Sequence, residues 1–417
     1  MRTRHHRVTA ASCASLAAGL LLSSCTILLP QPARVPPDAA RAPHGNAGRP
    51  ALDSALGAFV GSDAENVPEI DQLQDWLGGT DLRVGHTYLP GDTWQNIEGR
   101  PAFLRPWARW KQGASDRLFV LNVPLLEGNE NRVGDEEVRE LLRRAAGGEF
   151  DEHFRTLAHH LVDAGVPDTV LVPGWEMNGT TYTHRCAPDP EAWKAYWRRV
   201  VTVMREVPGQ RFRFDFTPSR GRDAIGWTEC YPGDDVVDIL GMDSYDQPAG
   251  ESFSDMVHEP FGLQAQVDFA AAHGKPVSYP EWGLFRNGDN PGYVTQMLKW
   301  MDRHHPVYQT ITDYCPHGVW GCEENPASAR AYREALFGRP QSSSPTTVPG
   351  PAATGGARPE PTATPAPATR PPHGRPAAGV RPAPRRCLEL RGWFSRLLGR
   401  HRLCLRLGWL PRADDRR

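Results

Sequence analysis

The stretch Val170-Leu-Val-Pro-Gly-Trp-Glu-Met-Asn-Gly179 joins a short apolar run to an acidic residue and a glycine turn. A second stretch, Pro276-Val-Ser-Tyr-Pro-Glu-Trp-Gly283, has the same organisation. Short apolar runs bounded by Pro and Gly are typical of buried strands in a parallel sheet. Glu176 and Glu281 would then each stand where a strand ends, beside a tryptophan, and burial there can tune the pKa of a carboxyl group.

Two such carboxyl groups suggest the hydrolysis of a glycosidic bond. This chemistry needs one group that protonates the leaving oxygen and one carboxylate that faces the anomeric carbon, and it needs neither metal nor cofactor. The sequence contains no glycine-rich nucleotide loop, no Gly-x-Ser-x-Gly elbow and no Cys-x-x-Cys or His-Glu-x-x-His zinc pattern. We therefore expect no cofactor and no metal site.

Strand-like runs alternate with amphipathic helical patterns through the middle of the chain, which is typical of βα units around a parallel sheet. Eight such repeats in about 290 residues predict an α/β fold of the (β/α)8 TIM-barrel type, whose reacting groups lie at the carboxyl ends of the strands. The expected strands are 57–60, 82–85, 117–121, 170–173, 211–216, 236–241, 276–279 and 310–314, and the clearest helices are 150–164, 190–207, 261–273 and 293–303.

The flanks of the chain differ in composition from its middle. A basic start, an Ala/Leu-rich segment and Leu22-Ser-Ser-Cys25 resemble a bacterial lipoprotein signal, in which Cys25 would carry the lipid; an ordinary cleaved signal is the alternative. Tracts rich in Pro predict linkers on both sides of the domain. The expected segments are a signal at 1–25, a linker at 26–50, the catalytic domain at 51–340, a linker at 341–384 and a basic tail at 385–417.

Charge separates the domain from its flanks. Residues 1–50 carry six arginines and one acid, and residues 341–417 carry fourteen arginines and four acids, which leaves 27 basic and 44 acidic residues between them. A net charge of −17 repels phosphate backbones, so we expect no nucleic-acid partner, whereas a neutral polysaccharide is indifferent to it. The Arg-rich tail is interpreted as disordered or as the product of a frameshift, with an amphipathic helix on an anionic membrane as the alternative.

Four motifs in order, Gly57-Ala-Phe-Val-Gly61, Trp175-Glu-Met-Asn-Gly179, Gly241-Met-Asp-Ser-Tyr-Asp246 and Pro280-Glu-Trp-Gly283, resemble glycoside hydrolase family 26, which includes many endo-β-1,4-mannanases. The resemblance spans the predicted domain. It implies a retaining mechanism with Glu176 as the acid/base and Glu281 as the nucleophile, about 5–5.5 Å apart across the sugar. Many mannanases of the family carry a histidine where this chain has Trp175, a departure that affects contacts to the sugar at the cleavage point.

The resemblance also implies that the Tyr245 hydroxyl lies against the nucleophile, as in related barrel glycosidases. Asn178 is expected to donate to a sugar hydroxyl. Trp175, Trp282 and Trp320 are expected to stack on pyranose rings, because a flat aromatic surface suits the C–H face of a sugar. Asp243 and Asp246 are interpreted as turn formers.

Cysteine positions favour an oxidising compartment. Cys186 and Cys230 fall in the loops after the expected fourth and fifth strands, and Cys315 and Cys322 share the loop after the eighth. Two disulfides, Cys186–Cys230 and Cys315–Cys322, are therefore predicted.

Together these features predict an exported, lipid-anchored, monomeric retaining endo-β-glycanase, with β-1,4-mannan as the first substrate to consider. Two alternatives remain open at this point. One is a β-1,3-1,4-glucanase or β-1,3-xylanase of the same family. The other is a non-hydrolytic glycan-binding surface lipoprotein, against which the presence of two matched glutamates speaks.

Overall fold

The computed structural model of the chain describes residues 50–342 and the two short segments 386–389 and 402–405. The predicted signal with its lipidation site Cys25, nearly all of both predicted linkers, and the rest of the basic tail lie outside the described residues. These assignments stay predictions.

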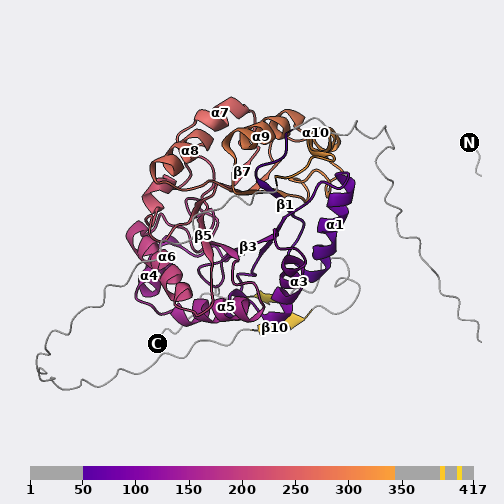
Figure 1. Cartoon of the computed structure of the whole chain (residues 1–417). Coiled ribbons are helices and arrows are strands. Elements are labelled where there is room, and N and C mark those ends of the chain that lie inside the picture. Colours follow the sequence, from indigo (N-terminus) through magenta and orange to yellow (C-terminus); the bar gives the residue numbers. More distant parts are fainter. Residues whose placement is uncertain (1–49, 343–385, 390–401, 406–417) are drawn as a thin grey trace, which may run out of the picture. The chain divides into compact units, whose positions relative to one another are not determined.

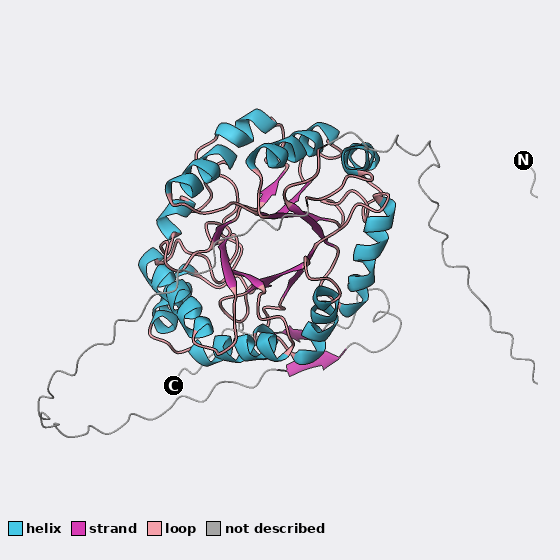
Figure 2. Cartoon of the chain, viewed as in Figure 1, coloured by secondary structure: helices cyan, strands magenta, loops and turns pink. Residues whose placement is uncertain are grey.

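A ring of parallel strands surrounded by helices forms the domain (Figures 1 and 2). The sheet has the strand order β6-β5-β4-β3-β2-β1-β9-β8-β7, and each neighbouring pair is parallel. The strands are β1 (Ala55–Phe59), β2 (Val84–Tyr88), β3 (Leu118–Val123), β4 (Val170–Pro173), β5 (Arg213–Phe216), β6 (Ile239–Leu240), β7 (Ser244–Tyr245), β8 (Tyr279–Gly283) and β9 (Tyr308–Thr312).

The two very short strands β6 and β7 together occupy the sixth position of the barrel. Between them, the backbone N–H of Gly241 donates to Phe216 on one side, and that of Met242 donates to Ser278 on the other, at 2.9 and 3.2 Å. Isolated bridges Ser219–Asp243 and Leu240–Val277 complete these contacts. The nine strands therefore fill eight positions, and the predicted (β/α)8 barrel is confirmed.

Helices cover the outside of the ring in Figure 2. The four helices that the sequence predicted are present as α5, α6, α8 and α9. The full set is η1 (Ala64–Asn66), α1 (Val67–Trp76), α2 (Trp94–Ile97), α3 (Pro101–Gln112), α4 (Asp135–Ala146), α5 (Asp151–Asp163), α6 (Pro190–Arg205), η2 (Trp227–Cys230), α7 (Phe253–His258), α8 (Leu263–Ala272), α9 (Pro291–His304) and α10 (Pro326–Leu336).

Helix α6 shows why these segments are helical and where they pack. Asp189 accepts a hydrogen bond from the backbone N–H of Ala192 at 3.1 Å, and Pro190 occupies the first turn, so the helix begins with a satisfied cap. Its apolar face carries Trp193 and Trp197, both fully buried against the barrel. Each buried indole contributes about 3–5 kcal/mol to stability relative to alanine.

The inside of the barrel changes from apolar to polar along the strands. Val84, Val120, Val170 and Val172 belong to one interior cluster and fill the lower barrel. Because side chains on a strand point to the same face at every second position, His86 follows Val84 into the interior, and Asn122 follows Val120. The polar side chains therefore gather at the carboxyl ends of the strands, where a barrel places its reacting groups.

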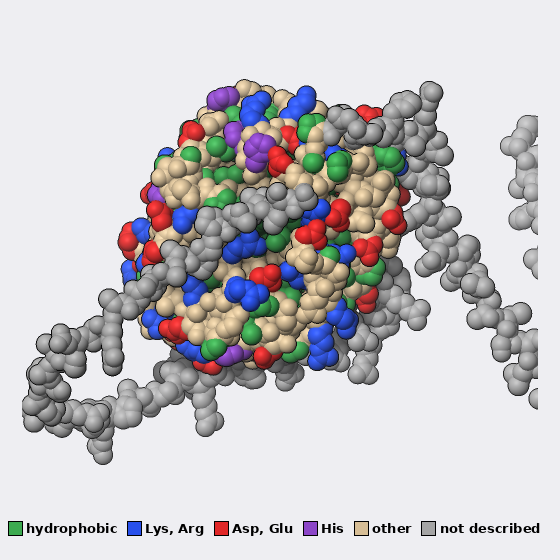
Figure 3. Space-filling view, viewed as in Figure 1, with side chains coloured by type: hydrophobic (Ala, Val, Ile, Leu, Met, Phe, Trp, Pro, Cys, Tyr) green, Lys and Arg blue, Asp and Glu red, His purple; other side chains and the backbone are tan. Residues whose placement is uncertain are grey.

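Acidic and basic side chains are interspersed over the face drawn in Figure 3, and neither sign forms a continuous patch there. No helix within the described residues is long and apolar enough to cross a membrane. In the tail, β10 (Arg386–Glu389) and β11 (Arg402–Leu405) pair as an antiparallel two-stranded sheet.

Candidate active site

Glu176 stands in a tight turn directly after β4. Its φ of 50° lies in the left-handed region, which few residues other than glycine adopt, and Gly174 just before it has φ 65°. The backbone N–H of Glu176 donates to the carbonyl oxygen of Thr217 at 2.8 Å, which ties the turn to the end of β5. This bond helps to hold the strained conformation, in which Glu176 is partly exposed.

Ser219, in the loop that follows β5, holds the carboxyl group of Glu176. Its hydroxyl donates to Oε1 of Glu176 at 2.7 Å. Asn178 in turn fixes Ser219, because its Oδ1 accepts from the backbone N–H of Ser219 at 2.9 Å and its Nδ2 donates to the carbonyl oxygen at 3.0 Å. Asn178 is fully buried, so the prediction that it donates to a sugar hydroxyl is wrong. Its amide group is already hydrogen-bonded to the backbone of the loop.

Glu281 lies in β8 and is only 6% exposed. The Tyr245 hydroxyl donates to its Oε2 at 2.7 Å, and Nδ2 of Asn122 donates to its Oε1 at 3.2 Å. The Tyr88 hydroxyl provides a third hydrogen bond. The sequence had placed Tyr245 against this carboxyl group, and the structure has it there; Asn122 and Tyr88 were not foreseen.

Glu176 and Glu281 differ in pKa because their surroundings differ. Burial, together with the negative charge of Glu281, raises the pKa of Glu176 to about 7, and one hydrogen bond from Ser219 opposes this. Burial also raises the pKa of Glu281, but three donors oppose it there. Glu281 therefore loses its proton first, and Glu176 keeps its proton to near neutral pH.

Asp243 is a third carboxyl group at the mouth of the barrel. It is 2% exposed, and no side chain among the described residues donates a hydrogen bond to either of its oxygens. Burial and the charges of Glu281 and Glu176 hold the pKa of Asp243 well above its usual range. Turn formation therefore does not describe Asp243. Asp246 does have a structural role, since its carboxylate accepts from Asn287 and Asn290.

A cleft of about 600 Å³ opens beside Glu281, within the usual size range for ligand sites. Its aromatic wall consists of Phe59, Tyr88, Trp175, Tyr182 and Tyr314, and its polar lining includes Asp92, Asn129, Glu130 and Asn131. Flat apolar rings interspersed with polar groups are what a sugar chain requires, because pyranoses offer both C–H faces and hydroxyl groups.

Residues 152–281, which include both glutamates, match the sequence profile of glycosyl hydrolase family 26. This part of the chain is therefore similar to that family. A search of curated protein sequences found no match.

Solved structures of family 26 share the fold at low sequence identity. A mannanase from Bacillus subtilis has a TM-score of 0.51 at 15% identity, over 69% of this chain and 87% of its own. An endo-β-1,4-mannanase from Bacillus sp. JAMB-750 has a TM-score of 0.51 at 17% identity, over 70% and 86%. A double mutant of an endo-β-1,4-mannanase from Cellulomonas fimi has a TM-score of 0.50 at 20% identity, over 64% and 66%.

Two of the three predicted sugar platforms lie outside the cleft. Trp282 is fully buried, and its Nε1 donates to Oε1 of Gln309 at 2.8 Å, so it serves the core. Trp320 is partly buried against the core and does not line the cleft. Trp175 does line it, with its ring edge-on to Tyr88 at a centroid distance of 5.5 Å.

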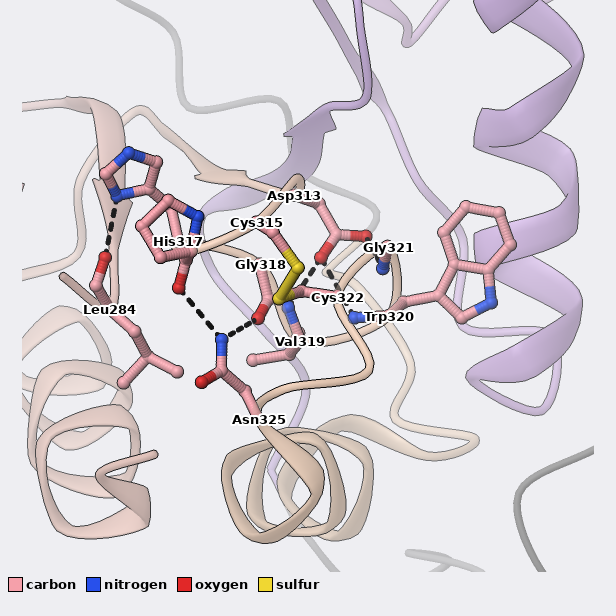
Figure 4. The surroundings of a disulfide bond; sticks show 11 residues. Leu284, Asp313, Cys315, His317, Gly318, Val319, Trp320, Gly321, Cys322 and Asn325 are labelled. Atoms are coloured by element: carbon pink, nitrogen blue, oxygen red, sulfur yellow. Dashed lines mark hydrogen bonds between the residues drawn. A yellow bond between two sulfur atoms is a disulfide. The ribbon is translucent and has the colours of Figure 1, made fainter. Parts of the chain in front are cut away.

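Tyr314, from the same loop as Trp320, is the residue of that loop that lines the cleft, and 46% of it is exposed. The loop is closed by the disulfide Cys315–Cys322 (Figure 4). Beneath it, the buried carboxylate of Asp313 accepts from the backbone N–H groups of three residues. These are Val319, Trp320 and Gly321. The second predicted disulfide, Cys186–Cys230, is also present.

Proposed function

We propose that this chain is a retaining endo-β-glycanase that cleaves β-1,4-mannan by double displacement. The observation that carries the proposal is the pair of glutamates at one barrel mouth, of which Glu281 ionises first while the pKa of Glu176 is about 7. A retaining glycosidase needs this division, since one group must be an anion while the other is still an acid.

In the first step, Glu281 attacks the anomeric carbon while Glu176 gives its proton to the glycosidic oxygen of the leaving sugar. The bond to the glycosyl group neutralises Glu281, and this removes the charge that raises the pKa of Glu176. Glu176, which has just lost its proton, therefore stays ionised at the same pH and is available as the base that takes a proton from water. In the second step, this water attacks the anomeric carbon and releases Glu281.

Mannan is proposed as the substrate because the solved structures named above are mannanases. Mixed-linkage β-1,3-1,4-glucan and β-1,3-xylan are the other substrates to test, since Trp175 lines the cleft directly beside the acid/base. The aromatic wall suits any chain of neutral pyranoses. Export, with a lipid anchor at Cys25, is part of the proposal, and the two disulfides of the domain support an oxidising compartment.

The test compares reducing-sugar release from mannan, mixed-linkage glucan and β-1,3-xylan. We expect release from mannan by the wild type and a loss of about 10⁴-fold or more for Glu281→Ala. Glu137→Ala, at an exposed position of α4, is the matched control and should retain full activity. Proton NMR of the first product reports stereochemistry. An inverted anomer would refute the double displacement, and binding without release from any glycan would refute the hydrolase.

A further inference from the structure

His86 occupies the interior of the barrel in β2 and is fully buried. Its Nε2 lies 2.9 Å from Oδ1 of Asn122, and its Nδ1 lies 3.1 Å from the hydroxyl of Thr310. Burial lowers the pKa of His86 to about 4, so the ring is neutral at the pH at which such an enzyme works. A neutral imidazole has one N–H and one lone pair, which limits how its partners can be arranged.

Asn122 connects this histidine to the nucleophile. It lies on β3 and is fully buried, and its Nδ2 donates to Oε1 of Glu281 at 3.2 Å. An ionised carboxylate only accepts hydrogen bonds, so the NH₂ group of Asn122 must face Glu281 and its Oδ1 must face His86. It follows that Nε2 of His86 carries the proton. Nδ1 lies beside the hydroxyl of Thr310, which donates to the carbonyl oxygen of Pro280.

We infer that His86 is a positioning residue for the nucleophile, because it holds the Asn122 amide in the orientation that presents N–H to Glu281. The inference rests on the proposed role of Glu281 as nucleophile. With no donor at position 86, the amide is free to turn over. It would then place its carbonyl oxygen against the carboxylate, and Glu281 would lose one of its three donors.

The alternative is that His86 merely satisfies a polar spot in the barrel core. Interior polar groups of that kind are present elsewhere, such as the Tyr308 hydroxyl, which donates to Asp215 at 2.7 Å. Neither partner of that pair forms a hydrogen bond with Glu281 or Asn122 in the described part of the chain. Tyr308→Phe therefore serves as the control for loss of a buried interior hydrogen bond.

The decisive comparison is His86→Met against His86→Gln. Both side chains have similar length, but only glutamine has an N–H that can donate to Oδ1 of Asn122. The δ-carboxyl carbon of Glu281, labelled with ¹³C and assigned by Glu281→Gln, is titrated by NMR in each variant. We expect the pKa of Glu281 to rise by about one unit in His86→Met and in Asn122→Ala, and to stay near the wild-type value in the glutamine variant.

Activity gives a second readout. The acidic limb of the pH profile of kcat should move to higher pH in His86→Met, with little change in KM. Tyr308→Phe should leave the limb in place. If His86→Met does not fold, His86→Phe makes the same comparison. An unchanged titration of Glu281 in the folded methionine or phenylalanine variant overturns the inference. The NMR titration needs no turnover, so a wild type that hydrolyses none of the glycans contradicts only the proposed function.

Discussion

Replacing Ser219 by alanine tests what sets the pKa of the acid/base. The Ser219 hydroxyl donates to Oε1 of Glu176 at 2.7 Å, and this bond stabilises the ionised form of the carboxyl group. Its removal should therefore raise the pKa of Glu176 above about 7. The two hydrogen bonds between the backbone of Ser219 and the side-chain amide of Asn178 do not involve the Ser219 hydroxyl and should remain.

The size of the shift follows from the strength of that bond. A hydrogen bond to a charged group contributes roughly 1.5–3 kcal/mol, and one pKa unit corresponds to about 1.36 kcal/mol. If no water reached the carboxyl group, the loss of this bond would raise its pKa by roughly one to two units. Glu176 is partly exposed, so water replaces part of the lost interaction, and we expect a rise of about one unit.

The pH dependence of kcat/KM measures this directly, because its basic limb reports the acid of the free enzyme. With the pKa one unit higher, the protonated fraction of Glu176 at pH 8 rises from about one tenth to about one half, so activity there should rise about five-fold relative to the wild type, with little change near pH 6. Ser219→Thr keeps a hydroxyl and should match the wild type. A basic limb that stays in place, or moves to lower pH, would refute this account of the acid/base.

Three further changes test other parts of the structure. Tyr245→Phe removes the hydroxyl that donates to Glu281 at 2.7 Å, so the acidic limb of the kcat/KM profile should move to higher pH by about one unit. An unmoved limb would contradict the role of this bond. Glu176→Gln should stabilise the protein at pH 8 by roughly 1–3 kcal/mol but not at pH 4, because a carboxyl group whose folded pKa is raised costs stability only above its unfolded pKa. Urea unfolding at both pH values measures this, and an equal effect at both would count against the raised pKa. Replacing Cys186 and Cys230 together by serine should cost about 4 kcal/mol from the loop of 44 residues, against about 2.4 kcal/mol for the loop of 7 closed by the other disulfide; urea unfolding under non-reducing conditions compares them, and the reverse order would contradict the loop-entropy argument.

The sequence predicted the barrel because each strand is short, apolar and bounded by turn residues, a local pattern that tertiary contacts did not override. It also predicted the two glutamates and Tyr245, whose motifs stand at strand ends. Strand alternation should have excluded Trp282 as a sugar platform. Glu281 faces the interior of β8, so the next side chain must face the helices, and the structure buries Trp282 there.

Other site residues depend on contacts that no local pattern reveals. Trp175 precedes a glutamate as well, but Glu176 has positive φ, so alternation ends there and Trp175 remains on the cleft. Asn122 and Tyr88 carried one faint signal, a polar residue in register near the carboxyl end of an apolar strand. Nothing in the sequence shows that the Asn178 amide is used by the loop of Ser219, because the two are 41 residues apart.

Three carboxyl groups meet at the barrel mouth, and hydrogen-bond donors decide which of them is charged. Burial acts in the same direction on Glu176, Asp243 and Glu281, since it disfavours the ionised form of each, and the charge of Glu281 raises the pKa of both Glu176 and Asp243. Glu281 has three side-chain donors, Glu176 has Ser219, and no side chain among the described residues donates to Asp243. As the pH rises, the first negative charge of the site therefore forms on Glu281, the carboxylate that we propose as the attacking group. Donors around Glu281, rather than its burial, suit it to the proposed role of nucleophile and leave Glu176 with the proton that the proposed acid must give.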